Sequence, residues 1–215
     1  MLNFLDVLEG TEFIYAGIAF ILVLVMSLSL HEFGHAFIAY KNGDMTPKVQ
    51  GRVTLNPLAH IDPIGFLCCA LFGFGWAKPV EINPLKFRKY KTGLFFTSIA
   101  GVTVNLILAF IGGGLMALSI KVYNGSWISG FFLYFSQFLF YINISLFIFN
   151  LLPVYPLDGF NCIAAVSKYD NRFVSFMRKY GNLILIILLV FGDTLMFQLT
   201  TWVGYPIIMF WSLIF

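Results

Sequence analysis

The sequence has few charged residues. Asp, Glu, Lys and Arg make up 11% of its 215 residues, whereas 60% are hydrophobic and 19% are aromatic. A soluble domain of this size has about 25% charged residues. The composition therefore argues against a soluble globular protein and predicts a single integral membrane domain over residues 1–215.

Cysteines are also scarce, and a signal peptide is not evident. Cys68, Cys69 and Cys162 form no CxxC pair, which argues against a disulfide framework and against a thiolate metal site. The N-terminus has neither the basic start nor the small-residue cleavage site of a signal peptide. We therefore expect the first hydrophobic run to remain in the mature protein.

Hydrophobic runs dominate the rest of the chain. A helical span needs about 20 mostly apolar residues, and runs of roughly this length lie at residues 13–33, 93–119, 129–152, 172–192 and 195–215. Residues 64–76 form a shorter apolar stretch, which we expect to be a re-entrant hairpin or a helix buried in protein. The pattern predicts an all-α polytopic protein of the lipid bilayer with about five to six transmembrane helices.

Residues 41–92 form the only sizeable polar insertion. Polar and apolar residues alternate over residues 48–55, a pattern typical of a half-exposed strand. Residues 78–82 predict a second short strand at an edge, because Pro79 has no N–H to donate. We expect a small β-strand insertion here, within a catalytic core that covers about residues 13–168.

The basic residues fall in two groups. Of the 13 Lys and Arg residues, eight lie between Lys41 and Lys91 and four between Lys168 and Lys179. With five spans both groups lie on one side of the membrane, and the positive-inside rule makes that side cytoplasmic. No nucleic-acid-binding motif accompanies these residues, so we expect no nucleic-acid partner.

The motif HEFGH, at residues 31–35, ends the first hydrophobic run, and residues 13–30 before it carry no charge. An ionisable side chain inside the bilayer costs about 2.5–3.5 kcal/mol, so the motif indicates a functional site. His31 and His35 are one helical turn apart and can bind one zinc ion, and Glu32 beside them can act as a general base on a water at the metal.

A catalytic zinc ion needs a third protein ligand and keeps one position open. His60, Asp62 and Glu81 lie in the polar insertion, whereas Asp158 lies at membrane level on backbone broken by two prolines. We favour Asp158, which with the two histidines would hold one Zn²⁺ per chain. The competing interpretation of Asp158 is a helix cap.

Two asparagines, Asn105 and Asn150, fall within apolar runs. Polar side chains in membranes commonly form hydrogen bonds between helices. The alternative is that Asn105 and Asn150 bind substrate or an oxyanion near the metal. The sequence leaves both interpretations open.

Together these features resemble the site-2 protease family of intramembrane zinc metalloproteases. The resemblance rests on HEFGH, on the blocks at residues 51–65 and 74–80, on Ala100-Gly101 followed by Asn105, and on residues 150–159. It covers most of residues 27–165. Val102 and Tyr155 stand where many relatives have proline, and neither departure changes a residue that the resemblance makes a ligand.

The resemblance implies that His31, His35 and Asp158 bind zinc, that Glu32 is the general base, and that the asparagines help to position substrate. Because the family cleaves transmembrane segments, it also implies a transmembrane protein substrate. The chain is similar to the compact form of the family without PDZ and CBS domains, which suits a prokaryotic cell membrane. The sequence does not identify a gating or regulatory membrane partner.

Peptide hydrolysis requires extended substrate backbone, and we expect residues 48–55 to receive it by strand addition. One alternative function is a metal-ion or proton transporter that uses the HEFGH site, although carriers more often have repeats and polar groups along a path. A second is an inactive pseudoprotease that binds spans without cutting. A di-iron oxygenase is disfavoured because three histidines are too few.

Overall fold

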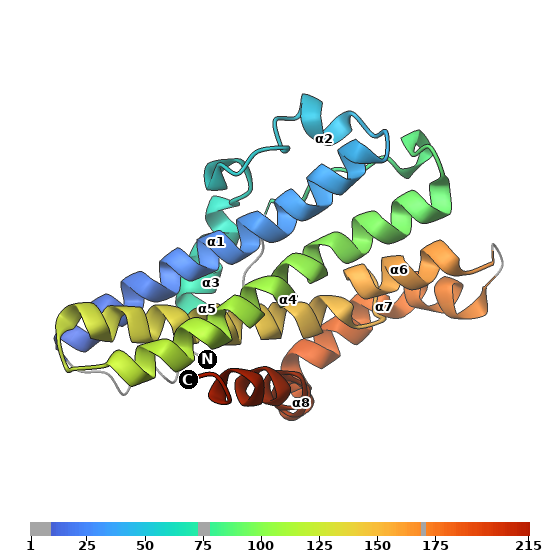
Figure 1. The fold of residues 1–215 in the computed structure, drawn as a ribbon. Helices are drawn as coiled ribbons and strands as arrows, with labels where there is room; N and C mark the ends of the chain where they lie inside the picture. The colour runs from blue at the N-terminus through green and yellow to red at the C-terminus, as the bar shows by residue number, and fades with distance from the viewer. Residues whose placement is uncertain (1–9, 73–77, 169–170) are drawn as a thin grey trace.

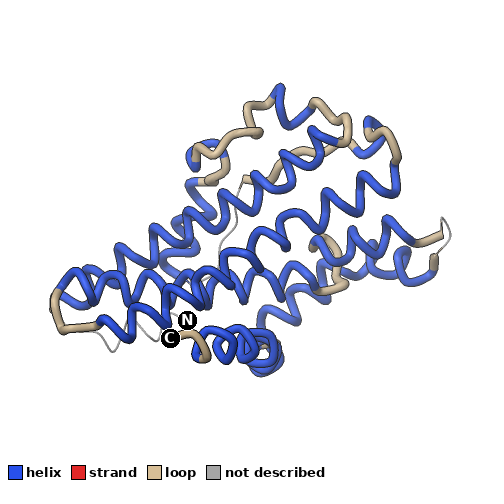
Figure 2. The backbone as a smooth tube through the Cα atoms, in the orientation of Figure 1, coloured by secondary structure: helices blue, strands red, loops and turns tan. Residues whose placement is uncertain are grey.

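The computed structural model describes residues 10–72, 78–168 and 171–215, and their regular secondary structure is helical (Figures 1 and 2). The helices are α1 (Thr11–Lys41), α2 (Thr46–Val49), α3 (Pro63–Phe72), α4 (Tyr90–Val122), α5 (Trp127–Leu151), α6 (Asp158–Val166), α7 (Arg172–Phe191) and α8 (Asp193–Ser212). The all-α prediction is confirmed for these residues.

Four of these helices, α1, α4, α5 and α7, are long and apolar enough to cross a membrane, which fits a multi-pass membrane protein. The fifth predicted run forms α8, which is not among the four. Asp193, Gln198 and Thr201 make α8 more polar than a typical span. The prediction of five to six spans is therefore not confirmed.

The short apolar stretch at residues 64–76 begins as a helix. Asp62 Oδ1 accepts hydrogen bonds from the N–H groups of Ile64 (3.0 Å) and Gly65 (2.8 Å), which caps α3 at its first turn. Residues 73–77 lie outside the described part of the chain. The re-entrant hairpin therefore stays a prediction.

The predicted strand at residues 48–55 is wrong. Lys48 and Val49 belong to α2, and Arg52 N–H donates back to Pro47 O at 2.8 Å, so the chain turns on itself. Gly51 has φ 70°, a left-handed conformation that suits glycine in such a turn. The alternation of polar and apolar residues did not produce a strand, because Pro47 favours the start of a helix and the turn at Gly51 follows directly.

The second predicted strand, residues 78–82, is also absent from the described structure, although its backbone is extended. Lys78 N–H donates to His60 O (2.8 Å), and Asn83 N–H donates to Asp44 Oδ2 (2.6 Å). Burial tends to raise the pKa of Asp44, but its hydrogen bonds with Thr46 and Asn83 lower the pKa below the ordinary value. These bonds fix both ends of the extended segment without a paired strand.

The core lies around α5, which packs against α1 on one side and against α4 and α8 on the other. Phe20 and Val23 of α1 meet Phe138 of α5, while Ala109 of α4 meets Phe140. Gly112 allows α4 and α5 to approach closely, because an added Cβ would lie 2.6 Å from the backbone nitrogen of Phe140. In a bilayer, hydrophobic burial contributes little to the association of helices, and small residues of this kind stabilise it by letting the helices pack closely.

We predict that Gly112→Ala lowers the stability of the protein in detergent by about 1–3 kcal/mol, because backbone atoms of α5 must move away. Thermal unfolding of the purified protein measures this. Gly17→Ala is the matched control, since a Cβ at Gly17 meets nothing within 4 Å and should leave stability unchanged or slightly higher. Equal unfolding temperatures for the two variants would contradict the packing argument.

Candidate metal centre

Three predicted residues meet at one end of the bundle, where the C-terminal part of α1 faces the start of α6 across α4 (Figure 1). His31 Nε2 lies 3.4 Å from Asp158 Oδ2, and His35 Nε2 lies 3.1 Å from the same oxygen. The two Nε2 atoms are 3.1 Å apart. These side chains form a group that could hold a metal ion.

The spacing fits zinc. A tetrahedral ion with bonds of about 2.0–2.1 Å separates its ligand atoms by roughly 3.3 Å. Both histidines are only 7% exposed, and Asp158 Oδ2 is a buried oxygen that no hydrogen bond satisfies within the described structure. Burying lone pairs and a carboxylate against one another is unfavourable unless a cation lies between them. His31, His35 and Asp158 therefore fit a zinc ion in number, chemistry and distance.

The outer nitrogen of each imidazole is also hydrogen-bonded. His35 Nδ1 donates to Thr97 O at 2.7 Å, and His31 Nδ1 donates to Asn105 Oδ1 at 2.5 Å. Because both partners are acceptors, the proton stays on Nδ1 and the Nε2 lone pair faces the metal position. Metal-binding histidines are commonly oriented by such partners.

The bond to Asn105 continues into a buried polar chain. Asn105 Nδ2 donates to Asn143 Oδ1 (2.9 Å), and Asn143 Nδ2 donates to Ser27 Oγ and to Leu139 O (both 2.8 Å). Ser27, Asn105 and Asn143 are completely buried. This series of hydrogen-bonded side chains joins α1, α4 and α5 behind His31, so three helices jointly fix the orientation of this imidazole.

Gly101 of α4 leaves the space through which both histidines reach Asp158. A Cβ at Gly101 would lie 2.6 Å from His31 Cε1 and would overlap His35 Nε2. Gly159 has a similar role beside Asp158. A Cβ at Gly159 would overlap the carbonyl oxygen of Leu151, so glycine lets α6 begin close to the end of α5. Both glycines of the sequence motifs thus have a steric role at the site.

A cavity of about 430 Å³ opens beside the three ligand candidates. Glu32 and Val80 line one part of it, and Asn150 and Leu157 line another. The carboxylate of Glu32 accepts a hydrogen bond from Val80 N–H at 3.1 Å. The extended segment at residues 78–83 therefore lies beside Glu32 and forms part of the cavity wall.

The two predicted asparagines differ in position. Asn150 lines the cavity, and its Nδ2 donates to Leu146 O of its own helix at 3.1 Å. Asn105 lies behind His31, completely buried, where it forms the interhelical hydrogen bonds described above. Sequence reasoning missed Asn143 and Ser27, although a polar Asn143 within a charge-free run was a signal of the same kind.

The other ligand candidates lie elsewhere. His60 Nε2 donates to Thr54 O at 2.9 Å, and Asp62 caps α3. Glu81 accepts a hydrogen bond from Gln50. Among the four acids and histidines considered as a third ligand, the structure brings only Asp158 to the HEFGH histidines.

The sequence is similar to known metalloproteases. Residues 115–192, which include Asp158, match the model described as Peptidase family M50. "Putative zinc metalloprotease YwhC" of Bacillus subtilis (strain 168) is 40% identical over 79% of this chain and 79% of its own length. "Putative zinc metalloprotease Rip2" of Mycolicibacterium smegmatis is 32% identical over 82% of this chain and 69% of its own length. No solved structure matches the chain.

These relatives show that the chain belongs to peptidase family M50, the site-2 protease family. With four helices suited to crossing a membrane, it is an intramembrane zinc metalloprotease of that family.

We predict that Gly101→Ala lowers the zinc content of the purified protein severely, because the new methyl group displaces both histidines. Atomic emission analysis of the folded, chelator-washed protein measures the metal. Gly112→Ala is the control on the same helix, since it disturbs packing away from the ligands and should keep its zinc. Full zinc content in Gly101→Ala would show that the histidines do not need this space.

We also predict that Asn105→Leu weakens zinc binding by about 10–100-fold, the usual effect of removing a partner that orients a metal-binding histidine. Competition with a calibrated chelator gives the affinity. Asn150→Leu removes an asparagine that contacts neither histidine and should bind zinc as tightly as the original chain. Unchanged affinity in Asn105→Leu would exclude an orienting role for the buried polar chain.

Proposed function

We propose that this protein hydrolyses peptide bonds in or near transmembrane segments of other membrane proteins, using one zinc ion per chain held by His31, His35 and Asp158. The observation that supports the ligand set most directly is the triangle of ligand atoms with sides of 3.1–3.4 Å. Both histidines belong to α1, a helix suited to crossing a membrane, so we expect a substrate helix to reach the site from within the bilayer or from its edge.

Zinc, when bound there, supplies Lewis-acid chemistry that polarises a carbonyl group and makes water nucleophilic near neutral pH. Glu32 acts as the general base: its carboxylate takes a proton from the attacking water and later passes it to the leaving nitrogen. The hydrogen bond from Val80 N–H holds one carboxylate oxygen of Glu32. The other oxygen is then directed toward the reacting water.

The extended segment at residues 78–83 is the better candidate to receive substrate, since residues 48–55 form no strand. Its ends and Val80 are already hydrogen-bonded, whereas the N–H groups of Glu81 and Ile82 have no backbone partner among the described residues. An unwound substrate segment can pair with these groups by strand addition. Asn150, on another part of the cavity lining, is positioned to contact the same substrate.

We further propose that the zinc end of the bundle faces the cytoplasm of a prokaryotic cell. Twelve of the 13 Lys and Arg residues lie between Lys41 and Lys91 or between Lys168 and Lys179, in or next to the connections between spans at this end. The exception, Lys121, lies in the last turn of α4, toward the opposite end. The positive-inside rule assigns such a side to the cytoplasm. The relatives named above are bacterial, which agrees with this location.

A transporter that uses HEFGH as a transit site is the alternative from another class. The candidate metal ligands lie at a single position, and the series of buried polar side chains behind His31 ends at Ser27, whose hydroxyl accepts a hydrogen bond from Asn143. A transport path needs polar groups that continue to the other side. This arrangement favours hydrolysis.

We predict that Glu32→Gln keeps zinc but abolishes cleavage of a co-expressed transmembrane substrate, with a loss of at least about 100-fold from removing the general base. Immunoblotting of substrate fragments and metal analysis of the same preparation give both values. Glu12→Gln, an exposed acid at the other end of α1, is the matched control and should cleave normally. Turnover that persists in Glu32→Gln would refute the assignment of the base.

A further inference from the structure

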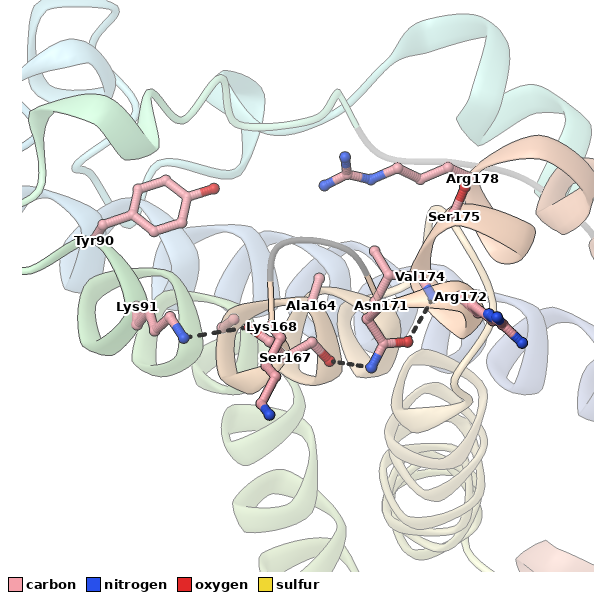
Figure 3. A pocket seen from close by; sticks show the side chains of 11 residues that line it. Tyr90, Lys91, Ala164, Ser167, Lys168, Asn171, Arg172, Val174, Ser175 and Arg178 are labelled. Atoms are coloured by element: carbon pink, nitrogen blue, oxygen red, sulfur yellow. Dashed lines mark hydrogen bonds between the residues drawn. The ribbon is translucent and has the colours of Figure 1, made fainter.

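A second cavity lies at the far end of α6 from Asp158, between α4, α6 and the start of α7 (Figure 3). Its volume is about 750 Å³, within the range of small-molecule sites. Four cations line it, from three separate segments: Lys91, Lys168, Arg172 and Arg178. No carboxylate is among the described residues that line this basic cavity, and Asp170 lies outside the described part of the chain.

Two side chains reach into the basic cavity from opposite walls. Figure 3 shows Tyr90 of α4 on one side and Arg178 of α7 on the other, with their polar ends directed toward each other across the space. Asn171, Ser175 and Arg178 recur at the spacing of one helical face, so the polar edge of α7 faces the cavity. Within the described residues the Arg178 guanidinium forms no hydrogen bond or ion pair.

Among the described residues, the other cations that line the cavity have no acidic partner either. Lys91 Nζ donates to Ser167 O at 3.3 Å, a bond that gives no compensating charge. Lys168 and Arg172 form no ion pair with any described carboxylate. Like charges around one cavity repel each other, so the arrangement favours an anionic ligand.

Membrane topology alone does not require basic residues to gather around one cavity. The positive-inside rule needs basic residues near the ends of spans, and Lys86, Arg88 and Lys89 fulfil it without lining the cavity. In the basic cavity, by contrast, residues from α4, the α6–α7 connection and α7 line one volume, and the Arg178 guanidinium is directed into it (Figure 3). Basic pockets between membrane helices are typical binding sites for anionic lipid headgroups.

Exposed apolar side chains lie next in sequence to residues that line the basic cavity. Val166 at the end of α6 is 66% exposed, and Phe173 and Phe176 of α7 are exposed as well. Such side chains can contact acyl chains while the cations contact a phosphate. We propose that the basic cavity binds the phosphodiester headgroup of an anionic phospholipid. This proposal is independent of the zinc chemistry.

The test uses the full chain in nanodiscs that contain phosphatidylcholine with a minor fraction of labelled phosphatidylglycerol. We expect the protein to retain phosphatidylglycerol in preference to phosphatidylcholine, and Lys168→Gln/Arg178→Gln to reduce this preference by about tenfold. Arg88→Gln/Lys89→Gln is the matched control, because it removes one Lys and one Arg at the same end of the bundle but outside the cavity. It should retain the lipid preference.

Two outcomes would overturn the proposal. An equal loss in both double variants would mean that the lipid responds to general surface charge, and displacement of the lipid by millimolar-range inorganic phosphate would identify free phosphate as the ligand. If the Lys168→Gln/Arg178→Gln variant cannot be reconstituted into nanodiscs, a salt titration of the original chain tests the proposal instead. The preference for phosphatidylglycerol should fall as ionic strength rises, and a preference that is independent of salt would contradict a charge-based headgroup site.

Discussion

The structure depends on the convergence of two imidazole nitrogens and one carboxylate oxygen within 3.4 Å of one another. Without a cation, these buried lone pairs and the negative charge repel each other. Much of the surrounding structure can be understood as the means of holding this arrangement. Gly101 leaves space for the histidines, Thr97 and Asn105 orient their rings, and the break after α5 brings the carboxylate into reach.

The bundle combines two kinds of contact that suit a lipid environment. Glycines such as Gly112 bring helix backbones close together, because apolar burial contributes little between helices in a bilayer. The buried chain from Ser27 through Asn143 to Asn105 adds hydrogen bonds between the same helices. These hydrogen bonds form only when the three helices are aligned in one way. They therefore hold α1, α4 and α5 in the alignment that brings the candidate ligands together.

Much of the site could be predicted from the sequence because ionisable residues in apolar runs are costly and therefore informative. HEFGH and Asp158 stood out for this reason, and the structure brings them together. The partnership of Asn105 with Asn143 could not be predicted, since it depends on how two helices are aligned. The strand at residues 48–55 was predicted wrongly because alternation was weighed above Pro47 and the turn at Gly51. The run at residues 195–215 was long enough for a span, but α8 is too polar to count among the four.

The central claim is that one zinc ion links α1 to the segment after α5 through His31, His35 and Asp158. X-ray absorption spectroscopy of the purified chain, together with its Asp158→Asn variant, tests this claim most directly. The account predicts one zinc per chain with two imidazole ligands and a carboxylate oxygen, and a marked loss of bound zinc in the variant. A zinc ion that keeps the same ligands and affinity in Asp158→Asn would contradict it.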